Sequence, residues 1–263
     1  MTRPRIMGIL NVTPDSFSDG GQHDDVRSAV AHGLKLVADG ADILDIGGES
    51  TRPGADPVTE AEEIRRTIPV IKALRHATDA PISIDTMKPN VARAAIKAGA
   101  TIWNDVSALR GPRATQLAAE LGCAVMLMHM QGDSRTMQER PVYDDVVAEV
   151  EDFLLARADA AIKAGVARDQ IVLDPGIGFG KTLDHNLALL RATDRFASHG
   201  YPILVGASRK RFIAAIDPHK DDGNRLGGSI HAALYAAAKG AAYLRVHDVR
   251  ETVQALKIQA ALG

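Results

Sequence analysis

Short apolar runs recur along the whole chain, and alanine-rich stretches with helical periodicity separate them. The runs are rich in Ile, Val, Leu and Met, a composition typical of buried strands. We predict eight strands, at Arg5–Leu10, Asp42–Ile46, Pro81–Ile84, Thr101–Trp103, Ala124–Met128, Ile171–Leu173, Pro202–Val205 and Ala242–Val246. Amphipathic helices are predicted between them, including Val26–Asp39, Thr59–His76, Pro89–Ala98 and Val146–Ala164.

Glycines mark the ends of several predicted helices, as expected where a helix stops in the left-handed conformation. The pairs concerned are Asp39-Gly40, Ala98-Gly99, Ala164-Gly165 and Lys239-Gly240. The strand–helix unit repeats without a Pro/Gly/Ser-rich linker, so residues 1–263 are predicted to form one domain, a single (β/α)8 TIM barrel. A doubly wound open sheet is the alternative, although it rarely needs eight near-uniform repeats.

Polar residues stand at the end of each of the eight predicted strands. They are Asn11, Asp45 to Glu49, Asp85, Asn104-Asp105, His129, Asp174, Gly206 to Lys210, and Arg245 to His247. A single Asp or Asn in such a place can be a helix cap or a turn former. In a parallel barrel, however, all these strand ends converge on one face, where barrel enzymes keep their active sites. The pattern therefore predicts one polar pocket that suits a hydrogen-bonding heterocycle and an anion.

Cations and one unusual loop refine this picture. Barrel enzymes often bind phosphate after strands seven and eight, and cationic Lys210, Arg245 and protonated His247 there would stabilise phosphate charge. Arg211 is interpreted as part of a solvated rim. The loop Asn11–Gly21 carries hydroxyls, carboxylates and one aromatic residue, Phe17, which an ordinary connecting loop seldom needs.

Two other chemistries are not supported. The segment LDPGIGFGKT places Pro175 where a nucleotide-binding P-loop needs its first glycine. The histidines show no zinc-site spacing, and no G-x-S-x-G elbow indicates acyl transfer. A Mg²⁺ ion held by one protein oxygen and by ligand phosphates remains open, because Mg²⁺ needs few protein ligands.

Composition and charge exclude several partners. The formal net charge of -2 offers no field for nucleic acid or an acidic membrane. Cys123 is the only cysteine and lies in an apolar run, so a buried, inert thiol is expected. The N-terminal apolar segment is too short for a signal peptide, which predicts a cytoplasmic protein.

Seven motifs appear in order between residue 6 and about residue 250: GILNVTPDSFSDGG, LDIGGESTRPGA, SIDT, WND, LDPGIGFGK, GASRKRF and RVHDV. Together they resemble the signatures of the bacterial dihydropteroate synthase family. The resemblance implies a homodimeric barrel that joins 6-hydroxymethyl-7,8-dihydropterin diphosphate to 4-aminobenzoate. The products are 7,8-dihydropteroate and diphosphate, a step of folate synthesis. Sulfonamides would compete for the aminobenzoate site.

The resemblance also assigns residues to each part of the site. Those for the pterin are Asp85, Asn104, Asp174, Lys210 and Arg245. Those for the diphosphate are Asn11, Arg52 and His247, with Mg²⁺ as cofactor at Asn11. Those for aminobenzoate are Thr51, Pro53, Phe17, Phe179 and Ser208. The residues expected to take part in catalysis are Lys210, Arg245, His247 and Arg52.

The implied mechanism starts with departure of the diphosphate, and the neutral amine of aminobenzoate then attacks the resulting methylene cation. A direct displacement stays open at this point. So do two other functions: a pterin-dependent methyltransferase domain and a non-catalytic pterin-binding barrel. A methyltransferase has no use for the anion site at Asn11, Arg52, Arg245 and His247, and a non-catalytic barrel would be expected to have lost Lys210 or Asp174.

Overall fold

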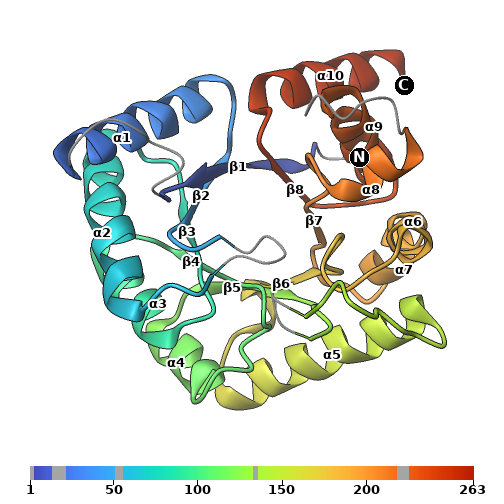
Figure 1. Ribbon diagram of the computed structural model, residues 1–263, viewed down its shortest axis with the longest axis horizontal. Coiled ribbons are helices and arrows are strands. Elements are labelled where there is room, and N and C mark those ends of the chain that lie inside the picture. Colours follow the sequence, from blue (N-terminus) through green and yellow to red (C-terminus); the bar gives the residue numbers. More distant parts are fainter. Residues whose placement is uncertain (1–2, 14–21, 51–55, 133–135, 218–224) are drawn as a thin grey trace.

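The chain folds into a barrel of parallel strands surrounded by helices, as a computed structural model shows (Figure 1). The structure describes residues 3–13, 22–50, 56–132, 136–217 and 225–263. The strands are β1 Arg5–Asn11, β2 Ile43–Gly47, β3 Ile82–Asp85, β4 Ile102–Asp105, β5 Ala124–Met128, β6 Ile171–Asp174, β7 Leu204–Val205 and β8 Tyr243–Val246. All of them lie within a residue or two of the predicted positions.

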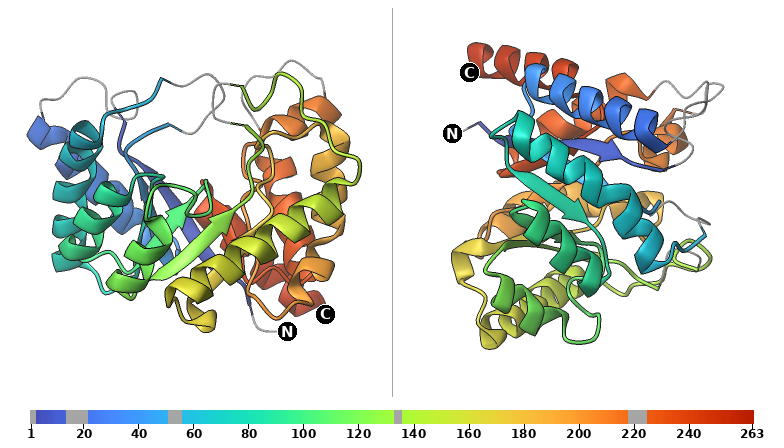
Figure 2. Two further views of the ribbon diagram at one scale, coloured as in Figure 1. Left: turned by 90° about the horizontal axis from the view of Figure 1, so that it is seen from below. Right: turned by 90° about the vertical axis from the view of Figure 1, so that its left-hand side faces the viewer.

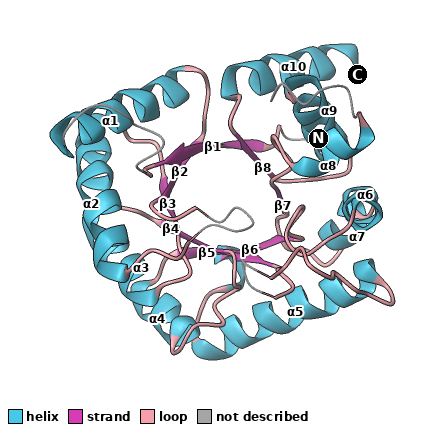
Figure 3. Cartoon of the chain, viewed as in Figure 1, coloured by secondary structure: helices cyan, strands magenta, loops and turns pink. Residues whose placement is uncertain are grey.

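The helices alternate with the strands and form the outer layer (Figure 3). They are α1 Gln22–Ala38, α2 Glu60–Ala77, α3 Pro89–Ala98, α4 Ala114–Leu121, α5 Val146–Ala164, α6 Leu183–Arg191, α7 Thr193–Ala197, α8 Arg211–Ile216, α9 Leu226–Ala238 and α10 Val249–Leu262. A short 3-10 turn, Arg168–Gln170, leads into β6. None of the described helices is both long and apolar enough to cross a bilayer.

The strand order confirms the predicted (β/α)8 barrel. Neighbouring strands pair in parallel in the order β6-β5-β4-β3-β2-β1-β8-β7. A single parallel bridge between Leu173 and Ile203 connects β6 to β7 and so closes the ring. The pairing of β1 with β8 brings the two ends of the chain's strand series together. An open doubly wound sheet is therefore excluded.

The barrel interior changes from apolar to polar along the strands. One apolar interior cluster contains Met7, Ile43, Ile102, Met126, Val172 and Leu204. Since alternate residues of a strand share a face, the residues two positions further along also point inward. In β2, β4 and β6 these are Asp45, Asn104 and Asp174, all buried. Along the strands, the apolar interior cluster is thus followed by a layer of buried polar side chains, which forms the floor of the barrel's polar end.

The polar ends of the strands and the loops that follow them lie together at one end of the barrel. In Figure 2 the C-terminus lies at the opposite end, and the strands rise away from it toward these loops. A second and larger apolar cluster fills the space between the strands and the helices. This core holds the loops in register, because every loop starts from a strand whose outer face is fixed by packing.

The loop after β6 passes unusually close to the end of β5. A Cβ atom on Gly176 would lie 2.0 Å from the carbonyl oxygen of His129, and Gly176 has a φ of 68°. In addition, the His129 amide donates to the Asp174 carbonyl at 3.0 Å. Only glycine fits here, on both steric and conformational grounds.

We expect Gly176→Ala to lower the free energy of unfolding by more than about 3 kcal/mol, since a backbone clash adds to the positive φ. Gly122→Ala is a matched control, because Gly122 has a φ of 61° but nothing within 4 Å of its Cβ position. The control should lose only about 1 kcal/mol. Urea unfolding measures both values, and equal losses would contradict the close approach.

Candidate active site

A cavity of about 1170 Å³ opens at the carboxyl ends of the strands. Seven of the residues assigned from the sequence line it: Asn11, Asp85, Phe179, Ser208, Lys210, Arg245 and His247. Asn104 and Asp174 lie buried at the ends of β4 and β6. Phe17, Thr51, Arg52 and Pro53 fall outside the described residues, so their assignments stay predictions.

Arg245 connects three strands at the base of the cavity. From β8, its Nε donates to Asp45 Oδ2 of β2 at 2.6 Å, and its Nη2 donates to Asp85 Oδ2 of β3 at 2.7 Å. The Arg245 side chain is only 17% exposed, while that of Asp45 is fully buried. Burial lowers the pKa of Arg245, but Asp45 and Asp85 outweigh that effect, so its pKa stays above the usual range. The guanidinium is therefore a permanent cation within the barrel.

Asp85 keeps one oxygen free for a ligand. Its Oδ1 is buried and has no hydrogen-bond partner among the residues that the structure describes. Burial raises the pKa of Asp85 to about 7, against the lowering effect of Arg245 and with a further raising effect from Asp45. A buried acceptor without a partner is costly. A ligand that offers an N–H group would remove that cost.

A second carboxylate, Asp174, sits at the end of β6. Its Oδ1 accepts from the Gly176 amide at 2.7 Å. Burial raises the pKa of Asp174 to about 6, although this hydrogen bond and the nearby Lys210 and Arg245 act in the opposite direction. Asn104 completes the floor, and its Nδ2 donates to Asp45 Oδ2 at 3.3 Å. Buried Asp45, Asn104 and Asp174 thus form the inward-facing polar layer of β2, β4 and β6, and Asp85 lines the cavity itself.

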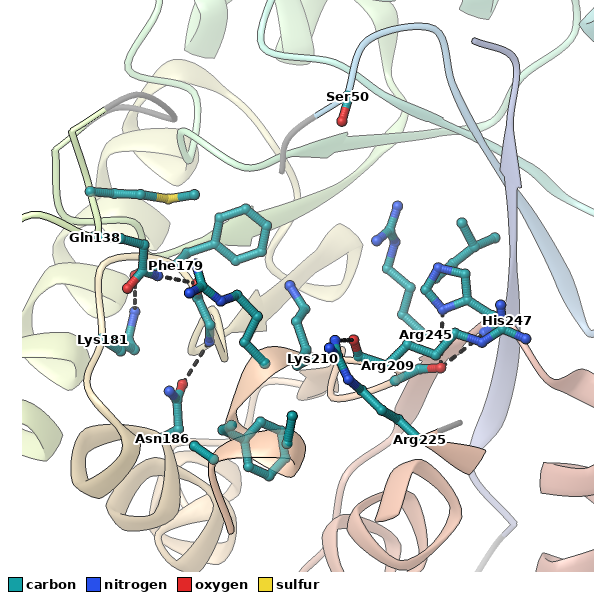
Figure 4. Close-up of a pocket in the computed structure, with 18 of the residues that line it drawn as sticks. Ser50, Gln138, Phe179, Lys181, Asn186, Arg209, Lys210, Arg225, Arg245 and His247 are labelled. Atoms are coloured by element: carbon teal, nitrogen blue, oxygen red, sulfur yellow. Dashed lines mark hydrogen bonds between the residues drawn. The ribbon is translucent and has the colours of Figure 1, made fainter. Parts of the chain in front are cut away.

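Lys210 and Phe179 face each other across the cavity wall (Figure 4). The Lys210 Nζ lies 3.9 Å from the centre of the Phe179 ring, a favourable cation–π distance. Burial and Arg245 lower the pKa of Lys210 to about 8, while Asp174 raises it. A Cβ on Gly178, whose φ is 85°, would come within 3.0 Å of Lys210 Cδ, so glycine makes room for this side chain.

Three consecutive carbonyl groups in the loop after β6 accept hydrogen bonds from side chains. Gln138 donates to Gly178 at 2.7 Å, Lys181 to Phe179 at 2.9 Å, and Tyr143 to Gly180 at 2.8 Å. Lys181 is buried and also lies 3.0 Å from His129 Nδ1. Burial lowers the pKa of Lys181 to about 7. The backbone that carries Phe179 is therefore fixed from several directions.

The partly buried His247 ring lies beside Ser208 and several cations. Its Nδ1 lies 3.0 Å from Ser208 Oγ, which also accepts from the His247 amide at 3.3 Å. Burial and the neighbouring Arg245 lower the pKa of His247 to about 4. The neutral ring is therefore favoured in the free protein at neutral pH, because burial beside cations disfavours another positive charge, and a protonated His247 beside phosphate stays a prediction. The neutral ring with its hydrogen on Nε2 satisfies the Ser208 contact and keeps a donor.

Metal binding has limited support from protein side chains. Within the described ranges no group of three or more His, Cys, Asp or Glu residues could hold an ion. The Asn11 side chain lines the cavity and has no hydrogen-bond partner among the described residues, so its oxygen is free to act as a ligand. This donor set fits a Mg²⁺ ion that takes most of its ligands from substrate phosphates and water.

Sequence reasoning assigned no role to Asp45, Lys181 or Gln138. The inward direction of Asp45 follows from the alternation of side chains along a strand, because Asp45 stands two residues after the inward-facing Ile43 in β2. Lys181 belongs to the motif LDPGIGFGK, but the motif alone assigns it no contact. Arg211, assigned to the rim, is exposed but also lines the cavity.

Comparison with known proteins agrees with this geometry. Residues 7–247 match the family described as pterin binding enzyme. The chain belongs to this family. The sequence is 48% identical to dihydropteroate synthase of Escherichia coli K12 over 258 residues, which cover 98% of this chain and 91% of that protein. The resemblance inferred from the motifs is thus confirmed.

Solved structures give the same result. Dihydropteroate synthase of Xanthomonas albilineans with 4-aminobenzoic acid is 53% identical with a TM-score of 0.93, and the match covers 99% of this chain and 93% of that one. The Yersinia pestis enzyme in a sulfonamide drug complex is 44% identical with a TM-score of 0.93, covering 99% and 94%. The pterin-binding fold therefore extends over essentially the whole chain.

The protonation state of His247 is testable by NMR. In the free protein we expect its ring to titrate with a midpoint near pH 4, because burial and Arg245 depress its pKa. Added inorganic diphosphate should raise this midpoint, since an anion stabilises the protonated ring. A free-protein midpoint at or above the ordinary value of about 6.5 would contradict the described environment.

Proposed function

We propose that this chain transfers the pterinylmethyl group of 6-hydroxymethyl-7,8-dihydropterin diphosphate to the amine of 4-aminobenzoate. The products are 7,8-dihydropteroate and diphosphate, and the step belongs to folate synthesis. The observation that carries the proposal is the cavity floor. There the unpartnered Oδ1 of Asp85 lies beside cationic Arg245, within a barrel whose family binds pterins. Such a floor suits a flat heterocycle with N–H donors on one edge.

The pterin would lie on this floor with its amino edge toward the carboxylates. Asp174 would accept from the ring N–H and the exocyclic amine, because a carboxylate is purely an acceptor. Asp85 Oδ1 and Asn104 would complete recognition of that edge. Lys210 would donate to the carbonyl oxygen and ring nitrogen on the other edge. Arg245 would stack its guanidinium plane on the heterocycle.

The diphosphate would lie at the mouth of the cavity. Asn11, Arg52 and His247 would bind it, and Asn11 would hold Mg²⁺, which when bound neutralises phosphate charge. Neutral His247 can donate from Nε2 and gains a proton more readily as negative charge builds up next to it. Arg52 would add a bidentate contact to the phosphate oxygens.

Aminobenzoate would enter from the side of the cavity lined by Phe179. Phe179 offers an aromatic surface on a backbone whose carbonyl Lys181 binds, and Ser208, which contacts His247, would frame the pocket together with it. Thr51, Pro53 and Phe17 would complete the pocket. A sulfonamide, which also carries an aniline ring, would compete for this place.

The residues support departure of the diphosphate before attack. Arg52 and His247 would stabilise the leaving charge, while Lys210 and Arg245 hold the pterin as its methylene carbon becomes positive. The C–O bond to the diphosphate breaks with its electron pair, and the neutral amine then forms the new C–N bond and loses a proton to the medium. No strong general base is needed, because an aniline is nucleophilic when neutral.

Three further assignments belong to the proposal: the chain acts as one domain over residues 1–263, forms a homodimer and works in the cytoplasm. The single ring of strands and the unbroken core favour one domain. A lone buried cysteine suits a reducing compartment.

The function is tested by assaying diphosphate release from the purified protein. We expect diphosphate release when the pterin diphosphate, Mg²⁺ and aminobenzoate are present, with 7,8-dihydropteroate formed in equal amount. Asp174→Asn should lower kcat/KM for the pterin diphosphate by about 10- to 100-fold, since a donor would face a donor. Asp169→Asn is the matched control, because Asp169 is an exposed carboxylate in the turn that precedes β6. Its kcat/KM should equal that of the wild type.

Two results would contradict the proposal. Pterin binding without any release would favour a non-catalytic barrel, and full activity of Asp174→Asn would remove the assigned pterin contact.

A further inference from the structure

Asp45 is a carboxylate inside the barrel that the proposed chemistry does not use. Its side chain is fully buried and points from β2 into the barrel interior. It stands two residues along the strand from Ile43, a member of the apolar interior cluster. A buried carboxylate is expensive unless it is paired and hydrogen-bonded. Its presence in a barrel floor therefore requires a structural or functional explanation.

The contacts of Asp45 converge on two residues of the proposed pterin site. Its Oδ2 accepts from Arg245 Nε at 2.6 Å and from Asn104 Nδ2 at 3.3 Å, and its Oδ1 lies 3.5 Å from the same Nδ2. Arg245 comes from β8 and Asn104 from β4, on either side of β2 in the ring. One buried carboxylate thus holds two side chains that reach the cavity floor from different strands.

Two attachments fix a guanidinium plane where one would let it rotate. Arg245 uses Nε for Asp45 and Nη2 for Asp85, so two carboxylates on adjacent strands determine its orientation. Its Nη1 has no hydrogen-bond partner among the described residues, and the side chain lines the cavity. Without Asp45, Asp85 alone would hold the guanidinium.

We infer that Asp45 is a positioning residue for pterin recognition: it fixes the plane of Arg245 and the amide of Asn104 without touching the ligand. This inference rests on the proposed function. Arg245 donates its Nε to Asp45 and only its Nη2 to Asp85 Oδ2. Asp85 Oδ1 therefore has no partner among the described residues and is free for the ligand. The role is specific to one substrate, since the contacts of Asp45 lead to the pterin floor and not to Phe179.

Asp45→Asn tests the inference. The amide has the same size, but its NH₂ group faces donors and it carries no charge for Arg245. We expect KM for the pterin diphosphate to rise about 10- to 100-fold, as for loss of a charge-assisted hydrogen bond. KM for aminobenzoate should change little, while the melting temperature should fall, since Arg245 loses one of its two buried carboxylate partners. A rise of less than twofold, or equal rises for both substrates, would overturn the inference.

Asp42→Asn is the matched control. Asp42 directly precedes β2 at the opposite end of the barrel, where it accepts from Arg3 and from the Ile6 amide. The substitution Asp42→Asn removes one paired carboxylate beside the same strand. It therefore shows whether the loss of any such carboxylate disturbs the barrel enough to change KM. Both KM values should stay at the wild-type level.

A double-mutant cycle distinguishes action through Arg245 from a separate structural effect. If Asp45 acts through the guanidinium, Asp45→Asn should cost much less in an Arg245→Lys background than in the wild type, and equal costs would overturn the inference. Should Asp45→Asn fail to fold, Asp45→Glu serves instead, since it keeps the charge but displaces Arg245 by one methylene. Inactive wild-type protein would contradict the proposed function itself, whereas active wild type with unaffected variants contradicts only the role of Asp45.

Discussion

The shared ion pair of Arg245 with Asp45 and Asp85 is the interaction on which the site depends. Taking a guanidinium and two carboxylates out of water is tolerable only when the charges are paired at hydrogen-bond distance, as they are here at 2.6 and 2.7 Å. The partners come from β8, β2 and β3, and β1 pairs with both β2 and β8, so this side of the closed ring brings the three side chains together. The floor therefore depends on closure of the barrel.

The same burial adjusts the electrostatics of the floor. Burial raises the pKa values of Asp85 and Asp174 to about 7 and about 6, and it lowers that of Lys210 to about 8. The pKa values of these three groups therefore lie within about one unit of neutral pH in the free protein. A ligand with N–H donors on one edge and acceptors on the other would stabilise their charged forms. The cavity is thus complementary to a polar heterocycle rather than to an apolar one.

Local periodicity predicted the fold well because the spacing of apolar residues in each strand and helix reflects which of its faces is buried. The weakest element is β7, where the predicted Pro202–Val205 reduces to Leu204–Val205 and one bridge at Ile203 completes the ring. The polar strand ends also predicted the position of the cavity, since a parallel barrel gathers them on one face. These are consequences of spacing along the chain, and spacing is visible in a sequence.

The properties that sequence reasoning missed depend on neighbours distant in the chain. Asp45 gains its importance from Arg245, 200 residues away. The neutral state of His247 follows from burial beside cations, and the buried Lys181 is held by a carbonyl and a ring nitrogen of His129 on another strand end. The spacing of residues along the chain does not show which distant side chains come into contact. The family motifs nevertheless located seven residues that line the cavity.

A crystal structure of the protein with 6-hydroxymethyl-7,8-dihydropterin diphosphate would show whether the shared ion pair organises the pterin floor. We expect Arg245 Nε to stay within hydrogen-bond distance of Asp45 while the pterin lies against the guanidinium plane and donates to Asp85 Oδ1. A complex in which Arg245 leaves Asp45, or in which the pterin binds away from Asp85, would contradict this expectation.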